Sequence, residues 1–446
     1  MHWDFNKLLE HFSADGKASL LQEGLFGLEK ENLRIQPSGD LALTPFPKGL
    51  GSSLTNPHIT TDFSESQIEM ITSPFSSIEG AFEHLMTLEK ETMASLENGE
   101  MLWPFSMPCR LPEEGKLPIA KYDDTPEGNR RELYRKGLAI RYGRMMQMLC
   151  GIHYNFSFGE MFWTELMALT KATVPRQSFV NNAYLHLTRN FLRDRWMLVY
   201  ILGASPMADK SYTCKALAKD RSKAISLRLS RCGYTNPAKI DVSYNDFDEH
   251  VSDIAKTVST PYGPYSQLDS SQQINDHLLQ IANEFYAPIR LKPPVSDNLL
   301  HGLQEEGAAY VEVRLLDINP FTPCGITLNE AYFLHLFLVH CLMQSSPPLS
   351  EAQRQDTGYI QEEVSVYGQM LFPEGREDLL ARMEELVPLA QLLDDQKVDR
   401  PYMKALEYYR AEVNEPKELP WKRMLDELNK TGEDFITYGV KLAKKS

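Results

Sequence analysis

The sequence predicts a mixed α+β fold that is followed by a helical C-terminal region. Before about residue 345, stretches with helical spacing of apolar residues alternate with short runs typical of strands. Residues 345–355 read SSPPLSEAQRQ, and their consecutive prolines interrupt a helical pattern because proline cannot continue a helix. After about residue 356, apolar residues recur with helical spacing, as in Leu379, Met383 and Leu386. We therefore predict two parts, residues 1–344 and residues 356–446, with the second packed on the first or continuous with it.

The elements of the first part follow from the same patterns. Strands are predicted for residues 25–35, 67–71, 152–158 and 309–315, where apolar and polar residues alternate. Helices are predicted for residues 78–98, 130–148 and 328–343, where apolar residues have helical spacing. The chain shows no internal repeat, and its 446 residues are enough to bury a core and enclose a cleft.

The chain is acidic, with 61 Asp and Glu against 46 Lys and Arg and a formal net charge of -15. This charge repels nucleic acid and anionic lipid surfaces, so neither is expected as a partner. The N-terminus has no basic start followed by an apolar run, and no apolar stretch approaches the length of a membrane span. We predict a cytoplasmic protein that binds neither nucleic acid nor membrane.

The six cysteines show neither a C-x-x-C pair nor a histidine at metal-ligand spacing, which argues against a zinc site and against a disulfide framework. They are predicted to be free thiols. These residues are Cys109, Cys150, Cys214, Cys232, Cys324 and Cys341.

Two segments place acidic residues at strand positions. In the run LEKENLR, a strand would put Glu29 and Glu31 on the same face, about two residue rises of 3.3 Å apart. In the run ITTDFSESQIEMI, Glu69 stands between apolar neighbours, and Asp62 lies where a strand passes into a loop. A solvated strand face and a turn cap explain these residues as well as a polar cleft does.

Two further strands combine polar groups with an apolar opposite face. The run IHYNFSF alternates so that His153, Asn155 and Ser157 share one face. Neutral imidazole binds divalent metal, although a lone histidine is more often structural. In the run YVEVRLL, Glu312 and Arg314 oppose valine and leucine. They form either a structural ion pair or a pair in which the carboxylate holds metal and the guanidinium holds a transferring phosphate.

Arginine and tyrosine recur together in three other segments, LYR, SLRLSRCGY and NEFYAPIR. Arginine can form bidentate hydrogen bonds with a substrate carboxylate, although both residue types are also ordinary surface residues. Motifs for a P-loop, a Rossmann nucleotide site, a serine nucleophile elbow and an H-E-x-x-H zinc site are absent. The sequence therefore favours a distributed set of strand-borne carboxylates, one histidine and several arginines, which suits a metal-bound nucleotide in an open sheet groove.

These residues lie in nine segments that resemble, in the same order, the glutamate-cysteine ligase family in its proteobacterial form, also called γ-glutamylcysteine synthetase. The segments are GLEKENLRI, ITTDFSESQIEMIT, MLWPFSMPC, LYRKGLAIRYGRMMQ, GIHYNFSF, LGASP, SLRLSRCGYTN, NEFYAPIR and YVEVRLLDINPF. The resemblance covers about residues 20–340. The chain is shorter than the typical member, and little of the family's pattern is recognised after about residue 350.

The resemblance implies that residues 1–344 form a catalytic ligase core of the glutamine-synthetase-like kind, in which a curved, mainly antiparallel sheet makes an active-site funnel. It also implies that Mg²⁺, with Mn²⁺ as a substitute, bridges protein carboxylates to the phosphates of ATP. The implied metal ligands are Glu29, Glu31, Asp62, Glu69, His153 and Glu312.

The resemblance further implies which residues act on the substrates. Arg228 and Arg314 would serve the reacting carboxylate and the phosphoryl group, with Glu312 as the third catalytic residue. The implied cysteine pocket consists of Phe63, Tyr134, Arg135, Tyr234 and Tyr286, and Arg228 also binds substrate. The implied reaction is an ATP-dependent ligation of the glutamate γ-carboxylate to the amine of cysteine through a γ-glutamyl phosphate, the first step of glutathione biosynthesis.

Two alternatives stay open from the sequence. One is a γ-glutamyl ligase of the same mechanism that uses another amine. The other is a non-catalytic homologue that only binds ligands, and the retention of all six metal-position residues speaks against it. The expected partners are glutamate, cysteine and ATP, while the oligomeric state is left open and a monomer is compatible with the sequence.

Overall fold

The sheet at the centre of the molecule is antiparallel throughout. The computed structural model describes residues 3–14, 16–214, 221–236, 239–294, 298–371, 373–395 and 397–445. Within these residues the strand order is β2-β3-β1-β5-β7-β6, and β4 pairs with the end of β1. The strands are β1 (Gly24–Ile35), β2 (Ile59–Thr61), β3 (Gln67–Ile71), β4 (Met101–Leu102), β5 (Ile152–Phe158), β6 (Ile289–Lys292) and β7 (Tyr310–Leu316). The predicted α+β class with a mainly antiparallel sheet is confirmed.

Each central strand has one apolar face and one polar face. Along β1, Phe26 and Leu28 are buried in the core, whereas Glu29 and Glu31 lie on the opposite face. Because side chains alternate along a strand, pairing the strands in register gathers all apolar side chains on one side of the sheet. The other core residues of this side are Ile68, Met70, Tyr154, Phe156, Ile289, Leu291, Val311 and Val313.

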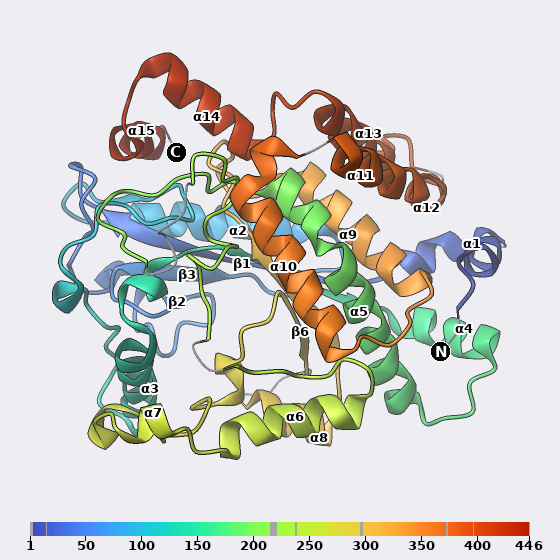
Figure 1. Cartoon of the computed structure of the whole chain (residues 1–446), viewed down its shortest axis with the longest axis horizontal. Coiled ribbons are helices and arrows are strands. Elements are labelled where there is room, and N and C mark those ends of the chain that lie inside the picture. Colours follow the sequence, from blue (N-terminus) through green and yellow to red (C-terminus); the bar gives the residue numbers. More distant parts are fainter. Residues whose placement is uncertain are drawn as a thin grey trace.

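Helices α2 (Ile78–Ala94), α5 (Arg176–Leu202) and α9 (Leu328–Met343) lie against the apolar face of the sheet (Figure 1). A capping box formed by Thr327 and Glu330 fixes the start of α9. From α9, the ring of His335 packs edge-on against Phe26 and Phe156. These helices close the core from one side and leave the opposite face of the sheet to the polar side chains.

The C-terminal region is helical, as predicted. Its helices are α10 (Glu351–Tyr367), α11 (Pro373–Glu385), α12 (Val387–Leu393), α13 (Pro401–Asn414), α14 (Pro420–Thr431) and α15 (Phe435–Ala443). Helices α10 and α14 pack on α5, and α13 packs on α9 (Figure 1). Helix α10 begins inside the segment predicted as a break, because Ser350 and Gln353 form a capping box there. The division into two domains stays a prediction.

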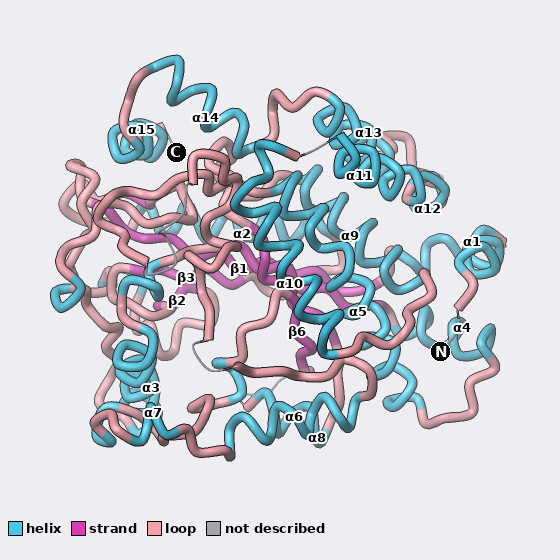
Figure 2. The backbone as a smooth tube through the Cα atoms, viewed as in Figure 1, coloured by secondary structure: helices cyan, strands magenta, loops and turns pink. Residues whose placement is uncertain are grey.

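The remaining helices lie around the edges of the sheet. They are α1 (Phe5–Ser13), α3 (Pro126–Tyr142), α4 (Glu160–Thr170), α6 (Phe247–Ser259), α7 (Gly263–Ser266) and α8 (Leu299–Glu305). Loops make up much of the molecule around α3 and β2 (Figure 2). The helix predicted for 130–148 starts earlier, because Thr125 caps it and Pro126 takes the first helical position. It ends at Tyr142, because Gly143 has a φ of 85°.

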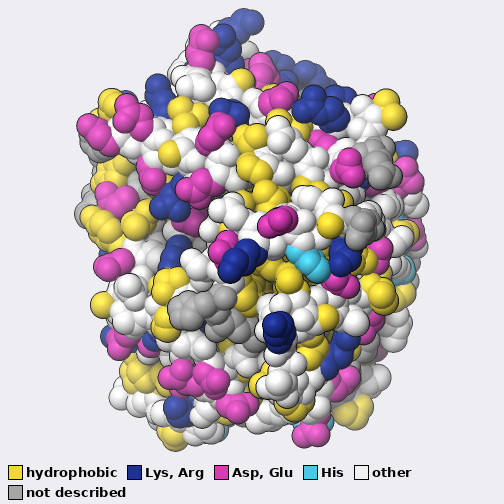
Figure 3. All heavy atoms as spheres, turned by 90° about the vertical axis from the view of Figure 1, so that its right-hand side faces the viewer, with side chains coloured by type: hydrophobic (Ala, Val, Ile, Leu, Met, Phe, Trp, Pro, Cys, Tyr) yellow, Lys and Arg dark blue, Asp and Glu magenta, His cyan; other side chains and the backbone are white. Residues whose placement is uncertain are grey.

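The face to the right in Figure 1 carries acidic, basic and hydrophobic side chains intermixed, so the acidic charge does not gather there (Figure 3). None of the helices in the described ranges is long and apolar enough to cross a membrane. The six cysteines are unpaired, and of these Cys214 alone is not buried.

Candidate active site

The pairing of the strands brings the predicted polar residues together on one face of the sheet. In the β1–β5 pair Glu29 lies opposite His153, and in the β1–β3 pair Glu31 lies opposite Glu69. In the β5–β7 pair Asn155 lies opposite Glu312. Residues that are directly opposite in an antiparallel pair have their side chains on the same face within about 5.5 Å. The register alone therefore builds a carboxylate–histidine cluster from residues far apart in the sequence.

Glu29, Glu69 and His153 form a group that could hold one metal ion, because one ligand atom from each lies within 4.8 Å of the others. His153 Nδ1 is 2.8 Å from Glu29 Oε2, and its Nε2 is 3.6 Å from Glu31 Oε1. Carboxylate oxygens suit Mg²⁺, and a carboxylate set with one imidazole also suits Mn²⁺. The residues present therefore fit a hard divalent cation.

The electrostatics of the cluster also favour a cation. Burial raises the pKa of Glu69 well above its usual value, and the carboxylates of Asp62, Glu29 and Glu31 raise it further. Burial likewise raises the pKa of Glu31. For Glu29, burial is the largest influence and acts to raise the pKa, but the hydrogen bond and charge of His153, together with the charge of Lys292, lower the pKa overall. Among the described residues, the carboxylates of Glu69 and Asp62 have no hydrogen-bond or ion-pair partner. A cluster of this kind has excess negative charge that a metal ion would neutralise.

Glu312 has different surroundings, although the sequence groups it with the metal ligands. Its Oε2 is 3.1 Å from Arg314 Nη1 and 3.6 Å from Arg290 Nη1, and its Oε1 is 3.5 Å from Lys292 Nζ. Burial acts to raise the pKa of Glu312, but the three basic side chains hold it well below its usual value. In the structure Glu312 orients Arg314, and its role as a metal ligand stays a prediction.

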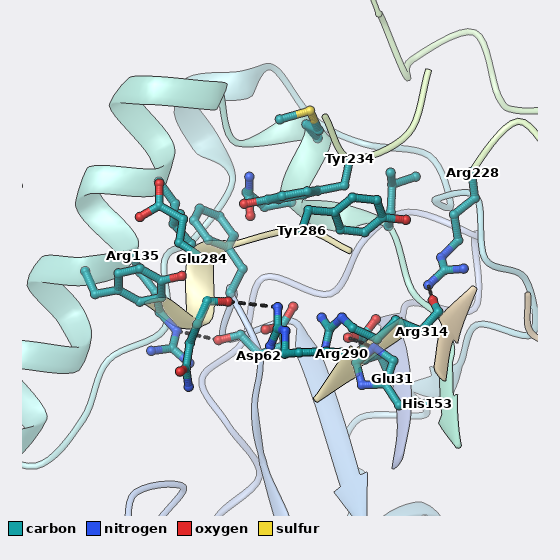
Figure 4. A pocket seen from close by; sticks show the side chains of 17 residues that line it. Glu31, Asp62, Arg135, His153, Arg228, Tyr234, Glu284, Tyr286, Arg290 and Arg314 are labelled. Carbon is teal, nitrogen blue, oxygen red and sulfur yellow. Dashed lines mark hydrogen bonds and ion pairs between the residues drawn. The ribbon is translucent and has the colours of Figure 1, made fainter. Parts of the chain in front are cut away.

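A cavity of about 160 Å³ opens beside the cluster, between β1, α3 and the loop that precedes β6 (Figure 4). This volume is below the roughly 300–1,000 Å³ of sites for drug-sized ligands, so the cavity suits one small substrate. Most of the predicted site residues line it, whereas Glu29, Glu69 and Glu312 do not. Those that line it are Glu31, Asp62, Phe63, Tyr134, Arg135, His153, Arg228, Tyr234, Tyr286 and Arg314.

Tyrosine hydroxyls supply free polar groups to this cavity. The rings of Tyr234 and Tyr286 lie side by side with centroids 5.3 Å apart (Figure 4). Within the described residues, the hydroxyls of Tyr134, Tyr234 and Tyr286 have no hydrogen-bond partner. Burial raises the pKa of Tyr134 and of Tyr234, so both stay neutral at physiological pH and can donate as well as accept a hydrogen bond.

Arg135 and Phe63 reach the cavity by different means. The guanidinium of Arg135 donates to the backbone carbonyls of Thr61 and Asp62, so it fixes the loop that carries Asp62. Phe63 is buried and contributes one apolar wall. Whether either side chain contacts a substrate stays a prediction.

Sequence reasoning did not assign Arg290 and Glu284, which also line the cavity. Arg290 donates to the backbone carbonyls of Asn283 and Phe285, and so holds the loop that carries Tyr286. Glu284 accepts hydrogen bonds from Tyr142 Oη and the Gln280 amide, and burial raises its pKa. Both lie in the segment NEFYAPIR, which the sequence indicates as a candidate binding segment. The sequence therefore indicated the segment, but not the roles of these two residues.

Comparison with known proteins identifies the relatives of this chain. The family model described as glutamate-cysteine ligase matches residues 9–364. A glutamate-cysteine ligase of Clostridium acetobutylicum is 37% identical, and the alignment covers 100% of both chains. A glutamate-cysteine ligase of Azotobacter vinelandii is 38% identical over 98% of this chain and 88% of that protein. The residues after 350, in which little family pattern was recognised, therefore have counterparts in full-length relatives.

Solved structures show the same fold. A glutamate-cysteine ligase of Francisella tularensis, solved in complex with AMP, superimposes with a TM-score of 0.86 at 27% identity, covering 95% of this chain and 88% of that one. A bifunctional glutathione synthetase of Pasteurella multocida gives a TM-score of 0.83 at 27% identity, covering 98% of this chain and 53% of that one. The family match over most of the sequence, the full-length relatives and the shared fold agree with the carboxylate–histidine face described above, and this chain belongs to the glutamate-cysteine ligase family.

Proposed function

We propose that this chain joins the γ-carboxylate of glutamate to the amine of cysteine at the expense of ATP, giving γ-glutamylcysteine, ADP and phosphate in the first step of glutathione biosynthesis. The observation that carries the proposal is the polar face of the sheet, where a carboxylate–histidine cluster adjoins a cavity lined by arginine and tyrosine. The membership of the family supports the same activity.

The carboxylate–histidine cluster is proposed to bind magnesium, with manganese as a substitute. Glu69 and Asp62 support this role most directly, because their carboxylates have no cationic partner among the described residues and the pKa of Glu69 is raised by its acidic neighbours. When bound, the ion would neutralise charge on the phosphates of ATP. The proposed ligands are Glu29, Glu31, Asp62, Glu69, His153 and Glu312.

The first chemical step makes the carboxylate of glutamate reactive. One γ-carboxylate oxygen attacks the γ-phosphorus of ATP, the bond from that phosphorus to the bridging oxygen breaks, and ADP leaves with the electron pair. Arg314 and Arg228 would stabilise the negative charge on the transferring group, and their position in the lining of the cavity supports this role. The ion pair of Arg314 with Glu312 fixes the direction of its guanidinium.

The second step forms the amide bond. The cysteine nitrogen, which has lost one ammonium proton, attacks the carbonyl carbon of γ-glutamyl phosphate, and phosphate leaves. Tyr134, Tyr234 and Tyr286 would hold the cysteine through hydroxyls that have no other partner among the described residues, and Phe63 would pack against its side chain. Holding the amine next to the acyl phosphate replaces a high substrate concentration.

Phosphate release with glutamate, ATP and each of the twenty amino acids tests this function. We expect cysteine to give the fastest release, and magnesium to be required. Release that is fastest with another amino acid would make the chain a γ-glutamyl ligase of different amine specificity. No release with any amine, in magnesium or manganese, would contradict catalysis altogether. The cytoplasmic location, the absence of nucleic-acid and membrane partners, and the oligomeric state stay predictions.

A further inference from the structure

We propose that Asp317 and Gly151 together fix the position of the Arg228 guanidinium, and that Asp317 is thereby a positioning residue for the reaction. This inference rests on the proposed function, because Arg228 is assigned there to the transferring group. Neither residue is among the predicted site residues, and neither lines the cavity.

Asp317 joins three segments of the chain through one carboxylate. It directly follows β7, the strand that carries Glu312 and Arg314. Its Oδ2 accepts hydrogen bonds from the Ala204 amide at 2.8 Å, from Ser205 Oγ at 2.7 Å and from Ser226 Oγ at 2.7 Å. The side chain is fully buried, and a buried carboxylate is destabilising unless it is hydrogen-bonded and paired. Three donors on one oxygen satisfy that half of the carboxylate.

The other oxygen of Asp317 is directed at Arg228. Among the described residues Asp317 Oδ1 has no hydrogen-bond partner, and it forms an ion pair with Arg228, whose Nη1 lies 3.6 Å away. Arg228 also donates from Nη1 to the Leu316 carbonyl at 3.1 Å and from Nη2 to the Arg314 carbonyl at 3.2 Å. The guanidinium is therefore held at the end of β7, at the edge of the cavity and near Arg314 (Figure 4).

Gly151 supplies the space for this arrangement. A Cβ atom at residue 151 would lie 1.9 Å from Arg228 Nη2 and 2.4 Å from its Cζ, so any larger residue would displace the guanidinium. The Gly151 amide donates to Glu31 Oε2 at 2.9 Å. The same residue thus sets the distance between Arg228 and the acidic cluster.

Asp317→Asn separates the two functions of the carboxylate, which are to accept hydrogen bonds at Oδ2 and to attract the Arg228 guanidinium at Oδ1. The amide oxygen of the new side chain can still accept the hydrogen bonds from Ala204, Ser205 and Ser226. The amide nitrogen then faces the Arg228 guanidinium, and two donors cannot pair. We expect kcat/KM for glutamate to fall at least tenfold, the scale of a lost charge-assisted contact. Ser226→Ala is the matched control, because of the two Asp317 oxygens it affects Oδ2 and leaves the Oδ1 side facing Arg228 intact, and we expect its kcat/KM to stay within about threefold of wild type.

A double-mutant cycle distinguishes positioning from general destabilisation. If Asp317 acts through Arg228, Asp317→Asn should change kcat/KM little when Arg228 is already lysine, because the interaction is gone in both variants. Equal losses in the wild-type and Arg228→Lys backgrounds would overturn the proposal. Gly151→Ala is the second variant if Asp317→Asn does not fold, and it should lower kcat/KM similarly by pushing the guanidinium aside.

Crystal structures of the wild type and of the Asp317→Asn or Gly151→Ala variant give a readout that does not depend on activity. We expect the Arg228 guanidinium to leave the Leu316 and Arg314 carbonyls in the variant. An unmoved guanidinium would overturn the proposal even if the chain used another substrate. If the wild type has no ligase activity but Arg228 is displaced in the variant, the proposed function is contradicted. The positioning of Arg228 by Asp317 and Gly151 is still supported in that case.

Discussion

Neutralising Glu69 and neutralising Glu312 should change the stability of the metal-free protein in opposite directions. Glu69→Gln removes a negative charge that lies beside other acids and has no ion-pair partner among the described residues, whereas Glu312→Gln removes the negative charge that three basic side chains share. The two substitutions are chemically identical, and both residues lie on the polar face of the same sheet. The expected difference in sign therefore tests the electrostatic description of the site without any activity measurement.

The distances give the size of each effect. Ligand atoms of Glu69 and Glu29 lie within 4.8 Å, and two like charges at that distance repel by about 3 kcal/mol at an effective dielectric constant of about 20. We expect Glu69→Gln to raise the free energy of unfolding by about 1–3 kcal/mol at pH 8, where Glu69 is more fully ionised. Removing one partner of a buried ion pair costs about 3–5 kcal/mol, so Glu312→Gln should lower it by that amount. For 446 residues that unfold together, about 1 kcal/mol corresponds to about 1 °C in Tm.

Calorimetry at pH 8 in a chelator, and again with excess magnesium, measures both effects. In chelator, the Tm of Glu69→Gln should lie about 1–3 °C above wild type and that of Glu312→Gln about 3–5 °C below. Magnesium at a hundred times its Kd should raise the wild-type Tm by about 3 °C and should raise that of Glu69→Gln much less. Glu113→Gln, at a solvent-exposed carboxylate, is the control and should change neither value. A lower Tm for Glu69→Gln in chelator would refute the reasoning.

Three further predictions follow from the structure. Tyr234→Phe or Tyr286→Phe should raise the KM for cysteine several-fold, the loss of about 0.5–1.5 kcal/mol for one neutral hydrogen bond, and a rise in the KM for ATP instead would contradict the pocket assignment. Dithiothreitol should leave the Tm unchanged, because all six cysteines are free thiols, and a fall of several degrees would reveal a disulfide. Burial lowers the pKa of His335 to about 3, so the unfolded chain binds its proton first and stability falls as the pH drops below about 6.5. His335→Gln should weaken that fall by up to about 1.4 kcal/mol per pH unit in urea unfolding, and an unchanged pH dependence would exclude a contribution from this residue.

Local patterns predicted the four longest strands to within one residue, but they missed the short strands β2, β4 and β6 and did not give the ends of the helices. Strand β5 has the predicted bounds because its alternation of polar and apolar residues is strict and spans its whole length. The helix predicted for 78–98 stops at Ala94, and the positive φ angles of Asn98 and Gly99 show that the chain has turned by then. Apolar spacing continues across such a turn, so periodicity alone overestimates the length of a helix.

The composition of the site could be predicted, but its division into interacting groups could not. The resemblance named Glu29, His153 and Glu312 as equivalent metal ligands. In the structure, cross-strand pairing joins Glu29 to His153, which is 124 positions away, whereas Glu312 is surrounded by basic side chains. The alternation within each strand indicates which side chains share a face, but it does not show which distant strands become neighbours in the sheet.

Acidic and basic side chains occupy different halves of the polar face, and this separation indicates which half would bind each ligand of the proposed reaction. The acids Glu29, Glu31 and Glu69 lie on β1 and β3, while Arg314, Arg290 and Lys292 lie on β7 and β6, with β5 and His153 between them. Neighbouring strands are about 4.8 Å apart, so β1 and β7 are separated by about 10 Å. In the proposed reaction the acidic half would hold magnesium, and the basic half would bind an anionic group of a substrate. Like charges gathered in this way weaken the metal-free protein, and bound ligands of opposite charge would offset that loss of stability.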